Sequence, residues 1–141
     1  MPVRRESTIF VDTSAFYALE VESDVNHEAA REFLKELREG RYGTLLTTDY
    51  VLDETLTPLR LRYGVRAALE FLEKLRESAS IRVVWVDEVV FEKALEYFER
   101  DEGRRWSFTD CTSFAVMELL GVEHAFAFDE DFERAGFARH P

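Results

Sequence analysis

The chain has few of the residues that would interrupt a compact fold or tie it to an oxidising compartment. Of its 141 residues, three are proline, six are glycine and only Cys111 is a cysteine. A lone cysteine excludes an internal disulfide, and no linker, repeat or low-complexity stretch is present. No apolar run is long enough for a signal peptide or a membrane span. We therefore expect a single domain over residues 1–141, cytoplasmic and without a membrane segment.

Positive charge is also scarce. The chain has 18 lysines and arginines against 29 aspartates and glutamates, which gives a formal net charge of −11. Because lysine and arginine dominate binding to phosphate backbones, this balance opposes a general affinity for nucleic acid. Any activity on RNA must therefore depend on a few local basic residues and on a metal ion.

Short β-branched runs alternate with amphipathic helical patterns along the chain. Apolar runs predict strands over residues 8–12, 43–47, 81–86 and 124–128, and helical spacing predicts helices over residues 26–37, 49–59, 65–75, 91–98 and 107–120. We expect Asn26 and Asp49 to cap two of these helices and Ser107 to begin the last. Pro58 should kink its helix or end the first part of it.

This order of elements predicts the fold class. Strands joined to helices by short turns form βαβ units, so we expect a three-layer α/β/α fold whose central sheet is mainly parallel. In such folds the functional site lies beyond the carboxyl ends of the strands, where the strand order reverses. The candidate catalytic residues are therefore the polar side chains that we expect at that edge of the sheet.

Four acids are expected at this edge of the sheet. Asp12 and Asp129 each follow an apolar strand, while Glu54 and Asp110 lie early in the helices after their turns. Each has an ordinary structural explanation when taken alone. Asp110 has the position of the reciprocal acid in a capping box with Ser107, the two strand-end aspartates can start turns, and Glu54 can be a solvated helix residue.

Taken together, four converging carboxylates predict a cation. Crowded carboxylates raise one another's pKa values and destabilise a fold unless a positive charge neutralises them. Ligand sets made only of oxygen favour hard ions such as Mg²⁺ or Mn²⁺. Such an ion lowers the pKa of a bound water and stabilises the charge that develops on a phosphodiester under in-line attack. The sequence therefore predicts chemistry on phosphate.

The segment before Asp110 supplies candidate contacts to RNA. Arg104 and Arg105 can hold phosphates, and the indole of Trp106 can stack on a base. The alternative is a solvated loop with Trp106 folded onto the core. Five further arginines are scattered enough for a solvated surface to be the better interpretation; they are Arg4, Arg5, Arg60, Arg62 and Arg66.

Four segments around the candidate acids follow one another in a definite order. They read IFVDTSAFYAL from residue 9, TTDYVLDETLT from residue 47, SFTDCTSFAVM from residue 107 and AFAFDEDFERAGF from residue 125. Each resembles one motif of the PIN domains of VapC-type toxins, and the order of the motifs is that of the family. The resemblance covers essentially the whole chain.

The resemblance implies an endoribonuclease that depends on Mg²⁺ or Mn²⁺ and is the toxin of a toxin–antitoxin pair. Its catalytic and metal-binding acids are then Asp12, Glu54, Asp110 and Asp129. Asp53 and Asp131 stay open as alternatives to their neighbours Glu54 and Asp129.

Hydroxyl residues beside the acids receive supporting roles from the same resemblance. Thr13, Ser14 and Thr109 are candidates to hydrogen-bond a carboxylate or a water at the metal. The implied partners are an RNA substrate, a second copy of the chain and a small antitoxin whose basic or aromatic segment suits an acidic cleft.

Other functions fit the sequence less well or remain open. A haloacid-dehalogenase-like phosphatase needs a second aspartate two places after the first, where this chain has Ser14. A response-regulator receiver needs a lysine near the end of a late strand, and none of Lys35, Lys74 and Lys93 is placed there. A non-catalytic PIN-like binding module and a housekeeping RNA-processing nuclease both stay open.

Overall fold

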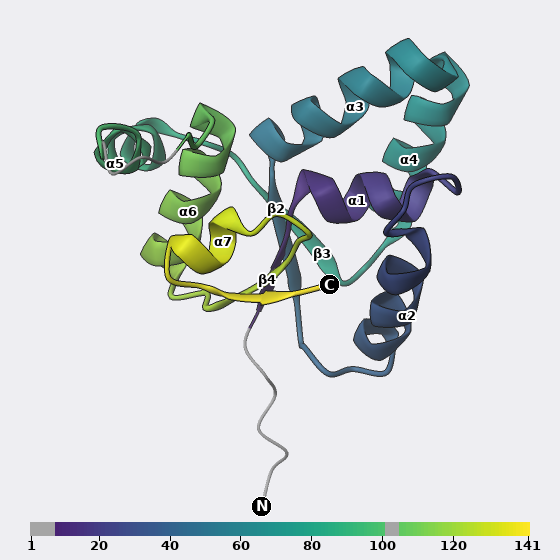
Figure 1. Ribbon diagram of the computed structural model, residues 1–141, viewed down its shortest axis with the longest axis horizontal. Coiled ribbons are helices and arrows are strands. Elements are labelled where there is room, and N and C mark those ends of the chain that lie inside the picture. Colours follow the sequence, from purple (N-terminus) through teal and green to yellow (C-terminus); the bar gives the residue numbers. More distant parts are fainter. Residues whose placement is uncertain (1–7, 101–104) are drawn as a thin grey trace, which may run out of the picture.

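Within residues 8–100 and 105–141, which the computed structural model describes, five strands form one sheet in the order β3-β2-β1-β4-β5 (Figure 1). They are β1 (Ile9–Val11), β2 (Leu45–Thr48), β3 (Ile81–Val84), β4 (His124–Phe126) and β5 (Ala138–His140). Every neighbouring pair is parallel. The predicted parallel α/β fold is confirmed, and β1 lies at the centre of the sheet.

Helices cover both faces of the sheet. They are α1 (Thr13–Glu20), α2 (His27–Arg38), α3 (Asp49–Tyr63), α4 (Val65–Glu77), α5 (Glu88–Phe98), α6 (Phe108–Leu120) and α7 (Asp131–Arg134). Figure 1 shows α5, α6 and α7 on one side of the strands and α1, α2 and α4 on the other, which confirms the three layers. No helix of the described residues is both long and apolar enough to cross a membrane.

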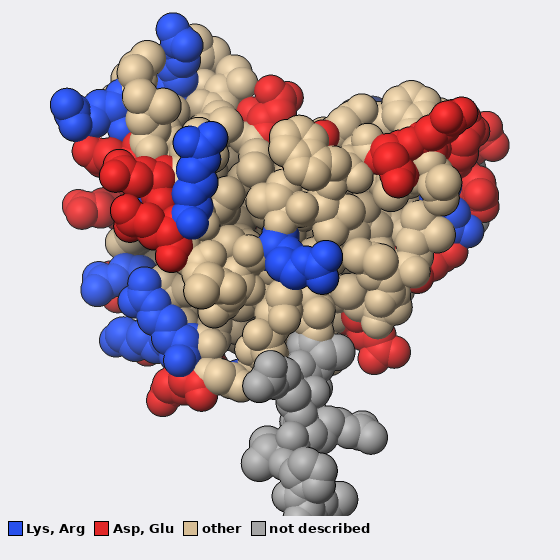
Figure 2. Space-filling view, turned by 180° about the vertical axis from the view of Figure 1, so that it is seen from behind, with Lys and Arg blue, Asp and Glu red and all other residues tan. Residues whose placement is uncertain are grey.

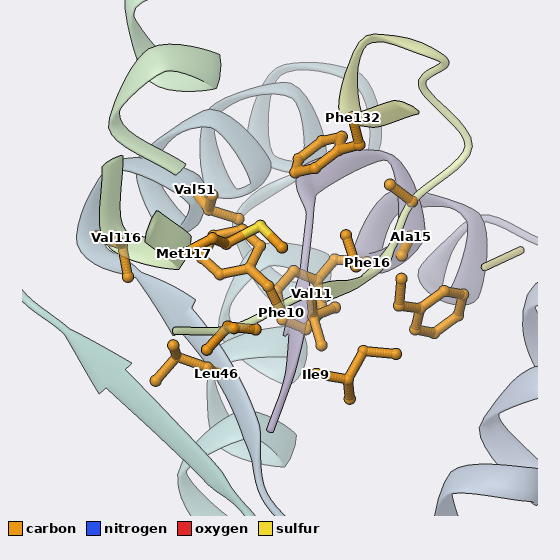
Figure 3. Close-up of a cluster of buried hydrophobic side chains, with 14 of the residues drawn as sticks. Ile9, Phe10, Val11, Ala15, Phe16, Leu46, Val51, Val116, Met117 and Phe132 are labelled. Carbon is orange, nitrogen blue, oxygen red and sulfur yellow. The ribbon is translucent and has the colours of Figure 1, made fainter. Parts of the chain in front are cut away.

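Strand β1 is apolar throughout because it is covered on both faces (Figure 3). Successive side chains of a strand point to opposite faces of its sheet. Phe10 accordingly packs toward α7, with its ring centroid 6.3 Å from that of Phe132. Val11 points to the other face and lines a cavity there together with Phe16. The core therefore has two halves that meet at β1.

Three short elements were absent from the prediction. No helix was predicted over residues 13–20, which form α1, and residues 131–140 contain α7 and β5, which were not predicted either. Elements of three to eight residues are too short to establish a periodic pattern in a sequence. The last predicted strand, at residues 124–128, ends at Phe126.

The start of α3 differs in detail from the prediction. Thr48, and not Asp49, is the N-cap, because its hydroxyl accepts a hydrogen bond from Val51 N at 3.0 Å. Asp49 instead accepts a hydrogen bond from Val86 N at 2.8 Å and so joins α3 to the segment after β3. Asn26 does take the N-cap position of α2, but its side chain makes no capping hydrogen bond.

Pro58 does not end α3, which continues to Tyr63. A proline inside a helix removes one backbone hydrogen bond and crowds the preceding turn. Here Val51, Thr55 and Leu59 are buried along one face of the helix. This burial keeps α3 packed on both sides of the proline, so Glu54 lies on a continuous helix.

Candidate active site

The four acids singled out in the sequence line one pocket of about 410 Å³ at the carboxyl ends of β1 and β4. The ends of these strands are joined by a hydrogen bond from Asp12 N to Phe126 O at 3.1 Å. The residues that line the pocket are Asp12, Thr13, Ser14, Tyr17, Asp24, Asn26, Glu54, Ser107, Asp110 and Asp129. The pocket thus lies where parallel sheets usually carry their sites.

Asp12 is the most deeply placed of these acids. Its side chain is only 4% exposed, and it accepts hydrogen bonds from Ser14 N at 3.1 Å and Ser14 Oγ at 2.8 Å. Burial is the main cause that raises the pKa of Asp12 to about 6; the nearby Glu54 carboxylate adds to the rise, while the two hydrogen bonds from Ser14 oppose it. A buried carboxylate of this kind gains from a cation beside it.

Ser14 connects two distant parts of the chain at the pocket. Its hydroxyl donates to Asp12 and accepts a hydrogen bond from Phe128 N at 2.9 Å. Phe128 immediately precedes Asp129, so one hydroxyl fixes the acid after β1 relative to the segment that carries the acid after β4. This arrangement agrees with the supporting role expected for Ser14.

Asp110 combines a structural position with a place in the pocket. Ser107 Oγ accepts from Asp110 N at 3.0 Å, and Asp110 Oδ2 accepts from Ser107 N at 3.1 Å, which completes the capping box at the start of α6. Burial raises the pKa of Asp110 to about 7, helped by the charges of Asp12 and Asp129. Asp110 is therefore both a helix-capping residue and a pocket residue, because its capping hydrogen bonds orient its carboxylate in the pocket.

Asp129 and Asp131 lie side by side. Asp129 accepts a hydrogen bond from Asp131 N at 2.9 Å, and carboxylate oxygens of Asp110, Asp129 and Asp131 lie within 4.8 Å of one another. Burial raises the pKa of Asp129, and the charge of Asp131 adds to this rise. Asp131 also forms an ion pair with Arg134 at 3.2 Å, so part of its charge is already balanced.

The choice between Asp53 and Glu54 is clear in the structure. Asp53 is exposed and is not among the residues that line the pocket, whereas Glu54 is half-buried and lines it. Glu54 is also close enough to Asp12 for its charge to raise the pKa of that carboxyl. The geometry therefore favours Glu54.

The donor set fits a hard divalent cation. It consists of carboxylate oxygens: those of Asp110, Asp129 and Asp131 lie within 4.8 Å of one another. Asp12 and Glu54 line the same pocket as Asp110 and Asp129. Mg²⁺ and Mn²⁺ prefer such oxygen ligands. Burial is the main cause of the raised pKa values of Asp12 and Asp110, and the charges of neighbouring carboxylates add to it, so a cation in the pocket would favour their ionised forms.

The hydroxyls of Thr13 and Thr109 make no hydrogen bond to a carboxylate among the described residues, and their role toward a water at the metal stays a prediction. The Thr13 hydroxyl donates to the backbone oxygen of Val51, at 3.4 Å, and not to a carboxylate. Thr109 is not among the pocket residues, and its backbone oxygen accepts a bond from the Thr112 hydroxyl at 2.6 Å. Both threonines lie in the first turn of a helix, where backbone groups compete for a side-chain hydroxyl.

Of the three residues before α6 that were predicted to contact RNA, the structure describes Arg105 and Trp106. Trp106 is 7% exposed and packs with its ring centroid 5.1 Å from that of Phe114, so its expected stacking on a base is wrong. Large aromatic side chains gain more from burial in the core than from an exposed loop. Arg105 is exposed, and Arg104 lies outside the described residues.

Sequence reasoning missed Tyr17, Asp24 and Asn26 as pocket residues. Tyr17 lies one helical turn after Thr13 on α1, so it was missed because α1 itself was not predicted. Asp24 accepts a hydrogen bond from Asn26 N at 2.8 Å in the turn between α1 and α2. Recognition of the helix after Asp12 would have placed Tyr17 beside the acids.

Comparison with known proteins identifies the family. Residues 9–138 match the family described as PIN domain. The chain belongs to the PIN-domain family. This PIN domain is 42% identical over 129 residues to the 23S rRNA-specific endonuclease VapC20 of Mycobacterium tuberculosis, a match that covers 92% of this chain and 95% of that protein. It is 35% identical over 114 residues to a VapC ribonuclease of Archaeoglobus fulgidus, covering 80% of this chain and 72% of that protein.

Solved structures agree with this assignment. The crystal structure of VapC20, a Sarcin-Ricin loop cleaving toxin, matches this PIN domain with a TM-score of 0.81 and 41% identity over 92% of this chain and 96% of that chain. VapBC2 from Rickettsia felis, bound to a DNA fragment from its promoter, matches with a TM-score of 0.70 at 9% identity, covering 94% and 97%. At so low an identity, the second match shows the fold alone.

Replacing Ser14 by alanine removes the hydroxyl that joins Asp12 to Phe128 N. We expect the free energy of unfolding to fall by about 1–3 kcal/mol, because two buried groups lose a hydrogen-bond partner. Ser113→Ala is the matched control, since its buried hydroxyl has no hydrogen-bond partner among the described residues. That change should cost less than about 1 kcal/mol. Urea unfolding measures both variants, and equal losses would contradict a bracing role for Ser14.

The raised pKa values predict how the metal-free PIN domain depends on pH. The folded chain keeps protons on Asp110 to about 7 and on Asp12 to about 6, whereas an ordinary aspartate releases its proton near 3.8. Their contribution to stability is therefore full below pH 3.8 and is lost as the pH rises through 6 and 7. In EDTA, we expect the melting temperature to fall between about pH 4 and about pH 7.

Two variants test the origin of this pH dependence. Asp110→Asn keeps an oxygen for the capping box but cannot titrate, so it should flatten the profile and raise the melting temperature near the upper end of the range. Asp53→Asn removes an exposed acid of the same charge and should leave the slope unchanged. A wild-type melting temperature that rises over this pH range would contradict the crowding of these carboxylates.

Proposed function

We propose that this PIN domain is an endoribonuclease that depends on Mg²⁺ or Mn²⁺, and that it is the toxin of a toxin–antitoxin pair. The observation that carries the proposal is the convergence of Asp12, Glu54, Asp110 and Asp129 in one pocket. The close relative VapC20, named as an endonuclease of 23S rRNA, supports RNA as the substrate. Hydrolysis of a phosphodiester is the chemistry that such an oxygen-lined pocket suits.

The residues of the pocket have separable tasks in this reaction. Asp110 and Asp129 would hold the ion, with Asp131 beside them, and Asp12 and Glu54 would add carboxylates from the same pocket. When bound, the ion neutralises the carboxylates, activates water and balances the charge that builds on the phosphate. Water adds to phosphorus, and the bond from phosphorus to the departing ribose oxygen breaks. Ser14 and Ser107 keep two of the acids oriented throughout.

The partners follow from the charge of the pocket and of the chain. A net charge of −11 and a pocket lined by acids suit a small antitoxin that presents basic or aromatic side chains. We include a second copy of the chain as a partner, as the VapC resemblance implies. Ribosomal RNA is the substrate class we favour, because the relative at 42% identity is named for 23S rRNA. Such a substrate places the activity in the cytoplasm.

Purified protein free of antitoxin should cut RNA that contains the 23S sarcin–ricin loop when Mg²⁺ or Mn²⁺ is present. EDTA should abolish cutting, and Asp110→Asn should lower kcat at least about a hundredfold, because the pocket then loses a charged oxygen ligand. Asp53→Asn is the matched control and should stay near wild type. Cutting that persists in EDTA, or in the Asp110→Asn protein, would rule out the proposed mechanism. Gel analysis of the cut RNA gives the rates.

Divalent ions should also stabilise the folded protein. Mn²⁺ at about a hundred times its Kd adds about 2.7 kcal/mol to the free energy of unfolding, since the folded state alone binds it. Differential scanning calorimetry should show a higher melting temperature for wild type and for Asp53→Asn, and a smaller rise for Asp110→Asn. A folded protein that shows no rise and cuts no RNA would favour the non-catalytic binding module.

A further inference from the structure

The end of α3 and the start of α4 depart from the charge balance of the rest of the chain. Residues 55–69, which we name the α3–α4 tip, contain Arg60, Arg62 and Arg66 and no acid, although acids outnumber bases by 29 to 18 overall. All three arginines are exposed. Figure 2 shows lysine and arginine side chains at the upper left of the molecule, where the α3–α4 tip lies. From the sequence alone, we interpret these arginines as scattered over a solvated surface. In the structure, all three lie within four residues of Gly64, where α3 ends and α4 begins.

The arginines of the α3–α4 tip are also without acidic partners. Within residues 8–100 and 105–141, no ion pair joins Arg60, Arg62 or Arg66 to an aspartate or glutamate, whereas Arg41, Lys74 and other bases are paired. An unpaired guanidinium keeps its full attraction for an outside anion. Phosphate is the anion whose geometry suits two parallel N–H donors of arginine.

A direct contact links the α3–α4 tip to the acidic pocket. Arg62 Nη1 donates to Tyr17 Oη at 3.1 Å, and the Arg62 guanidinium lies 6.0 Å from the centroid of the Tyr17 ring. Tyr17 lines the pocket together with Glu54. Along α3, Arg62 is two turns beyond Glu54, about 12 Å at 1.5 Å per residue. A short stretch of RNA spans that distance.

We propose that the α3–α4 tip, with Arg62 held by Tyr17, binds RNA phosphates next to the one that is cut. Guanidinium offers five N–H donors, and Tyr17 uses one of them, so the others are available for a phosphate. This inference rests on the proposed ribonuclease function, for which it supplies the cations that the pocket lacks.

The same tip exposes apolar side chains, so a protein partner is the alternative occupant. Leu61 is 79% exposed, and Leu69 and Val65 are exposed as well. The surface toward the end of α1 is acidic, because Glu20 and Glu70 line a pocket there. RNA therefore fits only the side of the tip that carries Arg62. The unpaired arginines favour RNA, and the experiment separates the two occupants.

Arg62→Gln tests the proposal, with Arg62→Lys and Arg76→Gln beside it. Arg76 is an exposed arginine at the other end of α4 and makes the matched control. The substrate is the 23S sarcin–ricin loop RNA, with kcat and KM measured in Mg²⁺. Binding of uncut RNA is measured by fluorescence anisotropy with each change placed in the Asp110→Asn protein.

We expect Arg62→Gln to raise KM and Kd about threefold to tenfold, with a smaller change in kcat, because it removes one phosphate contact. A plot of log affinity against log salt should become shallower by about 0.7. Arg62→Lys keeps the charge and should recover most of the binding, and Arg76→Gln should match wild type.

Other outcomes overturn the proposal in distinguishable ways. If wild type cuts RNA while Arg62→Gln, alone and combined with Arg60→Gln and Arg66→Gln, keeps the wild-type KM and salt slope, the proposal is wrong but the ribonuclease stands. If the combined variant binds RNA normally and loses only the antitoxin, the α3–α4 tip is a protein interface. If wild type neither binds nor cuts any RNA, both the proposed function and this inference fail.

Discussion

The removal of carboxylates from water is the constraint on which the rest of this structure depends. Asp12, Asp110 and Asp129 come from three separate elements, and burial is the main cause that raises the pKa of each, with the charges of neighbouring acids adding to the rise. The fold keeps them together with neutral hydrogen-bond donors, chiefly Ser14 and Ser107. Because these donors orient the carboxylates without neutralising them, the pocket keeps the negative charge that the proposed divalent ion would balance.

Much of this site was predictable because motifs and strand ends coincide. Strand β1 is a continuous apolar run that is followed directly by Asp12, so both the strand and the acid at its end could be predicted from the sequence. The position of Asp110 at the start of a helix could be predicted because it follows Ser107 by three residues, which is the spacing of a capping box. Parallel pairing of β1 with β4 then places Asp129 next to Asp12.

What the sequence did not reveal depends on short elements and on long-range packing. Helix α1 has eight residues, so its role in presenting Tyr17 was invisible as a periodic pattern. Burial of Trp106 against Phe114 depends on a contact between an irregular segment and the middle of α6. The pairing of Arg62 with Tyr17 joins residues 45 positions apart, and only the packing of α1 against α3 brings them together.

Because β1 lies between β2 and β4, the acidic pocket can form only after β4 has been added to the sheet during folding. The Ser14 hydroxyl meets Phe128 N, 114 residues later in the chain, and β1 gains its β4 neighbour only at that stage. Contacts of such long sequence separation form late in folding. During translation, the growing polypeptide therefore carries Asp12 without Asp129 until residues 124–129 have been made. A chain that ends before residue 124 therefore lacks both Asp129 and the Phe128 N–H that bonds to Ser14, and it has no four-acid pocket.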